Sequence, residues 1–180
     1  RPATDQRIGR FAVLGNHLPR HCGIATFTTH LADALGAELP DADGFVLAMN
    51  DIGRQHAYPP RVRFELKERD LASYRRAPDY LNVNQVDVLS VQHEYGIFGG
   101  KAGAHLLTLL RALRMPIVTT LHTVLSAPNA AQRDVIEELA RLSDRLVVMS
   151  ESGADLLRRV HGIPDDRIDL IPHGIPDIPI

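Results

Sequence analysis

The chain has 180 residues, with 20 Lys and Arg against 22 Asp and Glu, and 44% of its residues are hydrophobic. At roughly 150 residues per domain, this length predicts one domain with its own core. The composition excludes a disordered or collagen-like chain, and the near-neutral charge lacks the basic footprint of a nucleic-acid-binding protein.

The sequence shows neither the pattern of a membrane-spanning segment nor that of a secretion signal. No apolar run approaches the roughly 20 residues that span a bilayer, and the N-terminus has no signal-peptide core. The single cysteine, Cys22, excludes an intrachain disulfide and a zinc site built from several cysteines. We therefore expect a cytoplasmic location, either free or peripheral to the inner face of the membrane.

Seven short apolar runs predict strands. The runs cover residues 11–14, 45–49, 62–66, 86–91, 117–121, 146–149 and 168–171. Most are continuously apolar rather than alternating, which is typical of strands covered on both faces, as in a parallel sheet.

Helical patterns separate these runs. Apolar residues recur at steps of three and four from Ile24 to Leu39, and similar patterns cover residues 106–113, 135–142 and 156–160. The alternation predicts βαβ units with right-handed crossovers. We expect an α/β fold, Rossmann-like and doubly wound, with a mainly parallel sheet of about seven strands and helices on both faces.

The end of the chain differs from the rest. Pro172, Pro176 and Pro179 crowd the last nine residues, a stretch that cannot continue a helix. The pattern predicts one domain over residues 1–171 and the start of a linker over residues 172–180. Because the chain begins with Arg1 instead of Met, we expect it to be a processed product or a piece of a longer protein.

Polar residues collect after the predicted strands, where an open α/β sheet binds its ligands. The polar or small residues in these positions are Gly15, Asn16, His17, Arg20, His21, Cys22, Gly23, Asn50, Asp51, Gln92, His93, Glu94, His122, Thr123, Ser150, Glu151, His173 and Gly174. Five of the nine histidines, at positions 17, 21, 93, 122 and 173, thus fall at one edge of the sheet. A single histidine there is usually structural, but five favour a polar ligand cleft.

The first strand-to-helix turn does not carry a dinucleotide fingerprint. Its glycines, Gly15 and Gly23, have the wrong spacing for G-x-G-x-x-G. Gly23 nevertheless stands directly before a helix, where free N–H groups and the helix dipole attract phosphate. The alternative is a glycine that serves only the turn.

Two other motifs fail at fixed positions. Gly100 and Lys101 look like the end of a Walker A loop, but Tyr95 and Ala102 occupy positions that need Gly and Ser or Thr. The glycines at 99, 100 and 103 predict a flexible loop leading into a helix. A zinc-protease HExxH motif starting at His93 would need a second histidine where Ile97 stands. We expect no metal site.

Two further features have competing interpretations. Asp41-Ala-Asp43 matches the DxD of metal-dependent sugar transfer, but it precedes a strand and so lies at the opposite edge from the cleft; we interpret it as a solvated turn. Cys22, beside His21 at a helix start, is also the candidate nucleophile of a small cysteine-dependent hydrolase, which predicts inactivation by iodoacetamide.

Five segments occur in an order that resembles a known family. They are Leu18-Pro-Arg-His-Cys-Gly-Ile-Ala-Thr-Phe27, Val91-Gln-His-Glu-Tyr-Gly96, Thr119-Thr-Leu-His-Thr123, Val148-Met-Ser150 and Ile171-Pro-His-Gly-Ile175. Together they resemble the N-terminal domain of bacterial retaining glycosyltransferases of family 4, which have the GT-B fold of two Rossmann-like domains facing a cleft. The similarity covers residues 10–177.

The resemblance implies a nucleotide-sugar donor, a carbohydrate or lipid-linked acceptor, retention of anomeric configuration, and no metal or other cofactor. It also implies a C-terminal donor-binding domain beyond this chain, without which the chain is expected to be inactive. Because such a chain would expose its cleft face, we expect some self-association. No nucleic-acid partner is expected.

The resemblance also assigns residues. His122 matches the strand-end histidine that faces the reacting sugar and is the candidate catalytic residue. The candidate donor- and acceptor-binding residues are Arg20, Cys22, Gly23, His93, Glu94, Thr123, Ser150 and His173. Many relatives have two glycines in the first loop, where this chain has Cys22 and Gly23. The alternative from another class is a non-catalytic module that binds a glycan or a phosphorylated ligand.

Overall fold

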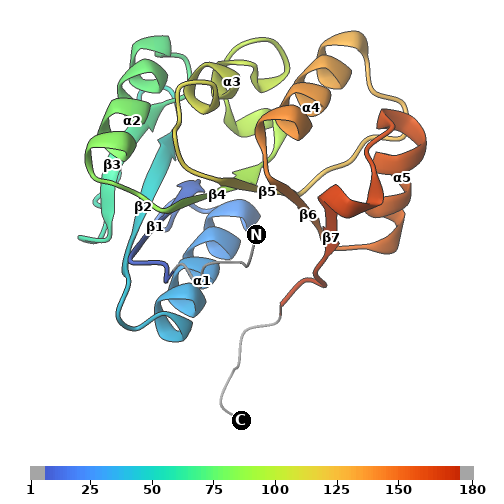
Figure 1. Ribbon diagram of the computed structural model, residues 1–180. Coiled ribbons are helices and arrows are strands. Elements are labelled where there is room, and N and C mark those ends of the chain that lie inside the picture. Colours follow the sequence, from blue (N-terminus) through green and yellow to red (C-terminus); the bar gives the residue numbers. More distant parts are fainter. Residues whose placement is uncertain (1–6, 175–180) are drawn as a thin grey trace.

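The computed structural model describes residues 7–174, in which seven strands form one parallel sheet (Figure 1). The sheet order is β3-β2-β1-β4-β5-β6-β7. The strands are β1 (Arg10–Gly15), β2 (Asp43–Asn50), β3 (Val62–Lys67), β4 (Val88–His93), β5 (Ile117–Leu121), β6 (Arg145–Val148) and β7 (Ile168–Leu170). All six neighbouring pairs are parallel. The predicted fold class and strand count are confirmed.

Five α-helices and three short 3₁₀ helices connect the strands. They are α1 (Gly23–Glu38), α2 (Leu71–Val83), η1 (Tyr95–Ile97), η2 (Lys101–Gly103), α3 (His105–Leu110), α4 (Ala130–Leu142), α5 (Glu151–His161) and η3 (Asp165–Arg167). The four predicted helices are all present. The sequence interpretation missed α2, which contains Pro78 and begins at the N-cap Asp70, whose side chain accepts from the Ala72 N–H at 3.0 Å.

The strand predicted over residues 86–91 is displaced in the structure. The Val86 N–H bonds to the Leu81 carbonyl, so Val86 belongs to the turn that closes α2. The strand instead continues to His93, which pairs with Leu121 of β5. Gln92 and His93 are therefore the last residues of β4 and not the first residues of the loop after it.

The helices are divided unequally between the two faces of the sheet. The chain crosses from β1 to β2 in one direction and from β3 through β7 in the other, so right-handed crossovers place α1 on one face and the other α-helices opposite. Residues 51–61 connect β2 to β3 without a helix. Figure 1 shows α1 below the sheet and α2 to α4 above it.

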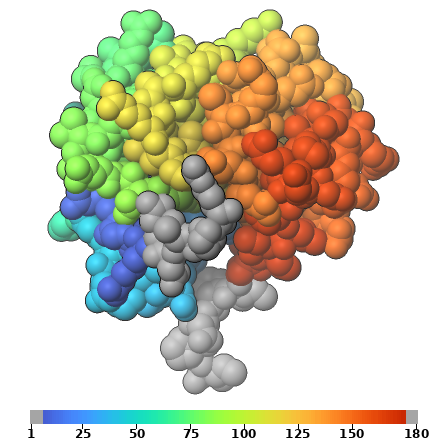
Figure 2. Space-filling model, viewed as in Figure 1, coloured from blue at the N-terminus to red at the C-terminus, as the bar shows by residue number. Residues whose placement is uncertain are grey.

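The hydrophobic core is likewise divided into two clusters, one on each face of the sheet. The larger hydrophobic cluster joins one face of the sheet to α2, α3, α4 and α5, and the smaller one joins α1 to the other face of β1 and β2. In the space-filling view the segments of α2 to α5 form a continuous layer over the top and right of the molecule (Figure 2). The α1 face thus has far less cover than the opposite face.

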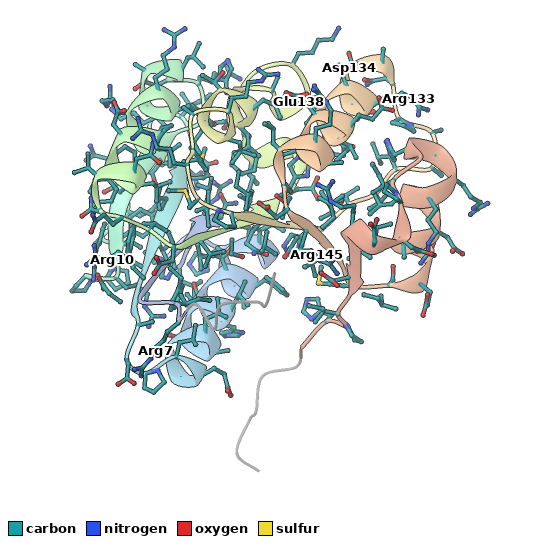
Figure 3. All side chains as sticks on the ribbon, viewed as in Figure 1. Arg7, Arg10, Arg133, Asp134, Glu138 and Arg145 are labelled. Atoms are coloured by element: carbon teal, nitrogen blue, oxygen red, sulfur yellow. The ribbon has the colours of Figure 1, made fainter. Side chains whose placement is uncertain are left out.

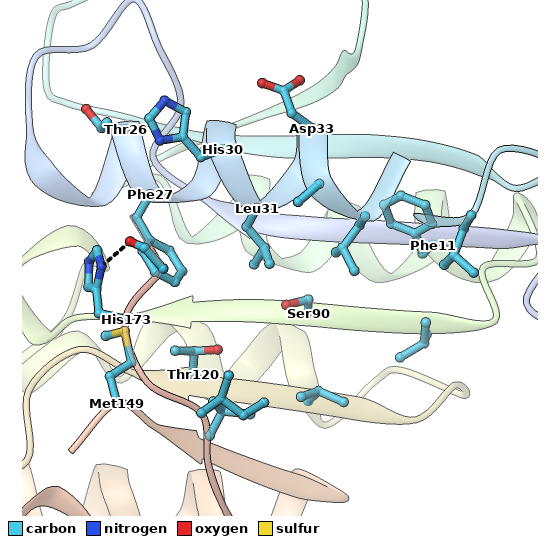
Figure 4. Close-up of a pocket in the computed structure, with 18 of the residues that line it drawn as sticks. Phe11, Thr26, Phe27, His30, Leu31, Asp33, Ser90, Thr120, Met149 and His173 are labelled. Carbon is cyan, nitrogen blue, oxygen red and sulfur yellow. Dashed lines mark hydrogen bonds between the residues drawn. The ribbon is translucent and has the colours of Figure 1, made fainter. Parts of the chain in front are cut away.

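A groove lies between α1 and the uncovered part of this face. It has a volume of about 1040 Å³, with Phe27 and Leu31 of α1 on one wall and side chains of β4, β5 and β6 on the other (Figure 4). Ser90 of β4, Val118 of β5 and Val147 of β6 line this second wall. They can share it because alternate residues of a strand point to the same face of the sheet. The carboxyl end of the groove reaches Gly23 and His173.

Ion pairs hold the amino ends of several strands. Arg10, the first residue of β1, pairs with Asp43 at 2.9 Å, and Arg145 at the start of β6 pairs with Asp169. Figure 3 labels the two arginines. Asp43 also pairs with Arg63 at 2.6 Å, and this hydrogen bond is the main cause that lowers the pKa of Asp43. The Asp41-Ala-Asp43 motif lies at the amino edge as expected. The interpretation as a solvated turn is wrong for Asp43, which begins β2 and is ion-paired.

The predicted domain boundary at residue 171 remains a prediction. Pro172, His173 and Gly174 follow β7 without regular structure, and the rest of the predicted linker, residues 175–180, lies outside the described residues.

Candidate functional site

The carboxyl ends of β4 and β5 bring the central candidate residues together. Gln92 pairs with Thr120 and His93 with Leu121 in the sheet register. The His122 N–H continues this ladder by donating to the His93 carbonyl at 3.0 Å. The two strands therefore place Gln92 and His122 side by side on the face that carries α1.

His122 is held on two sides. Its Nε2 lies 3.0 Å from Oε1 of Gln92, and the Phe27 ring from α1 meets the imidazole edge-on at 4.8 Å between centroids. Burial, and secondarily the neighbouring His173, lower the pKa of His122 to about 4. At pH 7 the imidazole is neutral, so it can contribute hydrogen bonding and orientation but no positive charge.

The N-terminus of α1 opens toward the same edge. Cys22 is its N-cap, with Sγ accepting from the Ala25 N–H at 3.4 Å. The N–H groups of Gly23 and Ile24 have no intrahelical partner, and a Cβ on Gly23 would meet nothing within 4 Å. These free donors and the helix dipole suit an anionic group such as phosphate. Phe27, one turn further on, connects this helix end to His122.

The contacts of Cys22 do not favour the hydrolase interpretation. Besides the Ala25 N–H, its sulfur accepts from Asn16 Nδ2 at 3.3 Å. Both recorded contacts are donors, whereas a nucleophilic thiol needs a base that takes its proton. Cys22 acts as a helix cap in this structure.

Glu94 and Thr123 face each other after the two strands. The Thr123 hydroxyl donates to one carboxylate oxygen of Glu94, and the other accepts from the Tyr95 N–H at 2.9 Å. Glu94 therefore caps η1 and ties the β4 loop to the β5 loop. Both side chains are half-buried, and Thr123 directly follows His122.

His93 lies on the opposite face from Gln92 and is completely enclosed. It is 0% exposed, with the Tyr95 ring at 5.1 Å and the Phe98 ring stacked at 6.1 Å. Burial is the main cause that lowers its pKa to about 3, and His122 adds to it. In this structure the His93 ring packs on the other face of the sheet from Gln92 and does not reach the surface of the site.

The remaining predicted residues are dispersed. His173 is exposed and packs on Phe27 at 5.1 Å, which places it beside His122. Ser150 caps α5 by accepting from the Gly153 N–H at 3.1 Å. Arg20 pairs with Asp51 at 2.6 Å, at the end of β2. His173 therefore joins the central group, whereas the recorded contacts of Ser150 and Arg20 lie outside it.

A second polar group lies at the ends of β1, β2 and β3. The Tyr58 hydroxyl donates to Asn50 Oδ1 at 2.7 Å, and burial, with the nearby Glu65, raises the pKa of Tyr58 to about 12. His17 is 2% exposed and meets the Tyr58 ring at 6.2 Å. The five predicted histidines thus divide: three surround β4 and β5, His17 joins this second group, and His21 is exposed.

Gln92 and Phe27 were not among the predicted donor- and acceptor-binding residues. Gln92 was recognised only as a polar residue at a strand end, and its full burial in β4 is the signal that separates it from exposed polar residues. Phe27 fits the apolar pattern of α1, and the sequence does not reveal that its ring meets two histidines.

Together, the open parallel sheet and the polar groups at its carboxyl edge define a Rossmann-like α/β domain, in which this edge is the usual place for a ligand. Within residues 7–174, no cluster of three or more His, Cys, Asp or Glu side chains could hold a metal ion. None of the helices in this part of the chain is long and apolar enough to cross a membrane.

The chain belongs to Glycosyltransferase Family 4, whose profile matches residues 16–177. No curated protein sequence matches at a significant level. Two solved structures share the fold. The apo form of the lipopolysaccharide outer core galactosyltransferase WaaB has 12% identity and a TM-score of 0.65, with 92% of this chain and 46% of that chain covered. A glycosyltransferase from Rickettsia africae ESF-5 has 13% identity and a TM-score of 0.61, with 92% and 43% covered. The chain spans less than half the length of either.

Proposed function

We propose that the chain is the acceptor-side domain of a two-domain glycosyltransferase that moves a sugar from a nucleotide-sugar donor to an acceptor hydroxyl with retention of configuration. Family membership supports sugar transfer, and the greater length of the two similar structures supports a second domain. The observation that carries the site assignment is the convergence of His122 and the open N-terminus of α1.

In this proposal the bond from the sugar to the donor phosphate breaks first, and an oxocarbenium-like centre forms. The acceptor hydroxyl attacks on the face that the phosphate leaves, and its proton passes to the departing phosphate oxygen. No protein nucleophile is needed. The N–H groups of Gly23 and Ile24 stabilise the phosphate charge, since they need no reorganisation as it develops.

His122 orients the reacting groups. Because burial keeps its imidazole neutral at pH 7, His122 binds a sugar hydroxyl by hydrogen bonding and does not act as a general acid. Glu94 and Thr123 fix the two loops that flank it. Most nucleotide contacts and a basic clamp for the diphosphate are assigned to the second domain. In this proposal the nucleotide sugar is a substrate, the reaction uses no metal and no cofactor, and the acceptor is a carbohydrate or a lipid-linked molecule.

The test compares His122→Ala with His30→Ala in the full-length gene product, using a panel of nucleotide sugars. We expect His122→Ala to lower turnover by at least about tenfold. His30 is an exposed histidine on α1 and serves as the matched control, with turnover unchanged. Unchanged transfer by His122→Ala would remove the assignment.

Calorimetry with the same nucleotide sugars separates the proposal from a non-catalytic binding module. The 180-residue chain should bind the donor weakly and show no transfer, whereas the full-length product should bind it tightly. Tight binding by the short chain would contradict a donor site carried mostly by the second domain. Glycan binding without transfer by the full-length product would favour the binding module.

A further inference from the structure

Gln92 occupies the centre of the sheet edge. It is the penultimate residue of β4, which lies between β1 and β5, and it is 0% exposed. A Cβ on Gly15, in β1, would come within 3.0 Å of the Gln92 Cβ and 2.8 Å of the Thr28 hydroxyl oxygen. The absence of a side chain at Gly15 therefore leaves the space in which the Gln92 amide stands.

Both ends of this amide are engaged. Its Nε2 donates to the Ser90 hydroxyl oxygen at 3.1 Å, and its Oε1 lies 3.0 Å from His122 Nε2. Ser90 lies two residues earlier on the same face of β4, so the amide can reach Ser90 and His122 at once. In this orientation of the amide, Oε1 faces His122 and can only accept, so His122 donates from Nε2.

The protonation state of the other ring nitrogen, Nδ1, follows from this. A neutral imidazole carries one N–H, so a proton on Nε2 leaves a lone pair on Nδ1. Among the residues that the structure describes, none is recorded in a hydrogen bond with His122 Nδ1. Both ring nitrogens of His93 are enclosed and have no hydrogen-bond partner, whereas His122 Nδ1 is not one of the enclosed nitrogens without a partner. His122 thus keeps a free acceptor at the site.

We propose that Gln92 is a positioning residue that holds His122 in its Nε2–H tautomer, so that Nδ1 accepts a hydrogen bond from a hydroxyl of the bound sugar. The identity of that ligand rests on the proposed function, whereas the tautomer does not. Phe27 restrains the ring plane and Gln92 selects the proton position. A hydroxyl donor is thereby preferred at Nδ1 over a second acceptor such as a carboxylate.

The ionisable groups around His122 do not determine its tautomer in place of Gln92. His173 approaches from the C-terminal segment and His93 from β4, and the neighbour from α1 is the uncharged Phe27. The nearest carboxylate in the β4 loop, Glu94, is engaged by Thr123 and the Tyr95 N–H. No recorded carboxylate contact competes with Gln92 for the Nε2 proton among the described residues.

The test is the histidine ring spectrum of the 180-residue chain labelled with ¹⁵N-histidine, in which two-bond ¹⁵N–¹H correlations show which nitrogen carries the proton. A His122→Gln variant assigns the signals. We expect the wild-type His122 to show the Nε2–H pattern from pH 6 to 8. The Nδ1–H pattern would overturn the proposal, because the Gln92 amide would then be reversed.

Two substitutions then test the residue itself. Gln92→Met keeps the side-chain length but removes both hydrogen bonds, and it should give His122 signals averaged between the two tautomers. Gln92→Glu keeps an acceptor and adds a negative charge, and it should raise the pKa of His122 by at least about one unit. Unchanged His122 signals in both variants would contradict a positioning role.

A matched control removes another buried polar group nearby. Thr119→Val acts on β5 but on the opposite face, where the threonine hydroxyl contacts the Ser143 hydroxyl at 2.7 Å. It should leave the His122 signals unchanged, and a shift as large as that of Gln92→Met would show a general loss of packing instead. Because the readout needs no substrate, failure of sugar transfer in the full-length product would leave the tautomer result standing, and the reverse also holds.

Discussion

Buried histidines give this chain a specific response to acid. Burial lowers the pKa of His93 to about 3 and that of His122 to about 4, and burial also lowers the pKa of His161. In the unfolded chain, histidines take up a proton near their ordinary value of about 6.5. As the pH falls below that value, the unfolded state therefore binds more protons than the folded state, and acid favours unfolding.

We predict that the free energy of unfolding is highest above pH 6.5 and falls between pH 6.5 and 5. Each neutral buried histidine contributes a slope of up to about 1.4 kcal/mol per pH unit. Urea unfolding at pH 7.5, 6.0 and 5.0 measures the slope, and His93→Phe should reduce it while keeping the ring against Phe98. Equal stability at pH 7.5 and 5.0, or an unchanged slope in His93→Phe, would contradict the prediction.

At the scale of elements, the loop between β4 and α3 is more firmly packed than its glycines indicate. A flexible loop was expected, but it forms η1 and η2, and Ile97 at the end of η1 is buried together with Phe98 and Gly99, which follow it. The Gly99 N–H donates to the Tyr74 hydroxyl at 3.0 Å, which itself donates to the Glu68 carbonyl at 3.1 Å. Gly99 is needed here for close approach: its Cβ would lie 1.9 Å from that carbonyl oxygen.

We predict that Gly99→Ala lowers the free energy of unfolding by about 1–3 kcal/mol, because the backbone at Glu68 must move to admit a methyl group. Gly96→Ala is the matched control in the same loop, since a Cβ there would meet nothing within 4 Å. Its effect should stay within about 0.5 kcal/mol. Chemical denaturation of both variants makes the comparison, and equal effects would show that close approach at Gly99 is not what limits the substitution.

Strands and helices were predictable from the sequence where hydrophobic periodicity alone determines them. The buried strands and the helix starting at Gly23 followed from apolar runs and steps of three and four. α2 was missed because Pro78 interrupts an otherwise helical stretch, although the chain around it packs into the core. In the candidate site, strand ends indicated His122 and Thr123, but the pairing of Gln92 with His122 depends on the register between β4 and β5, in which Gln92 lies opposite Thr120. The sequence does not reveal that register, because the predicted β4 run ended at residue 91.

For the molecule as a whole, the direction of the crossovers determines which surface stays open. One helix covers the α1 face because, of the two connections that cross there, only β1–β2 contains a helix, while the other α-helices cover the opposite face. The groove beside α1 is mainly apolar, and Ile8 and Ile171 on its border are 36% and 54% exposed. An apolar surface of this kind is a common site of association.

We predict that the 180-residue chain self-associates through this groove as its concentration rises. Met149→Lys, which replaces a half-buried side chain in the groove with a charged one of similar length, should shift the distribution toward monomer. Val83→Lys is the control, because Val83 is 80% exposed at the end of α2 and outside the groove. Light scattering over a concentration series measures the mass, with circular dichroism confirming the fold of each variant. A monomer at every concentration would refute the prediction, and an equal response to Val83→Lys would place the contact elsewhere.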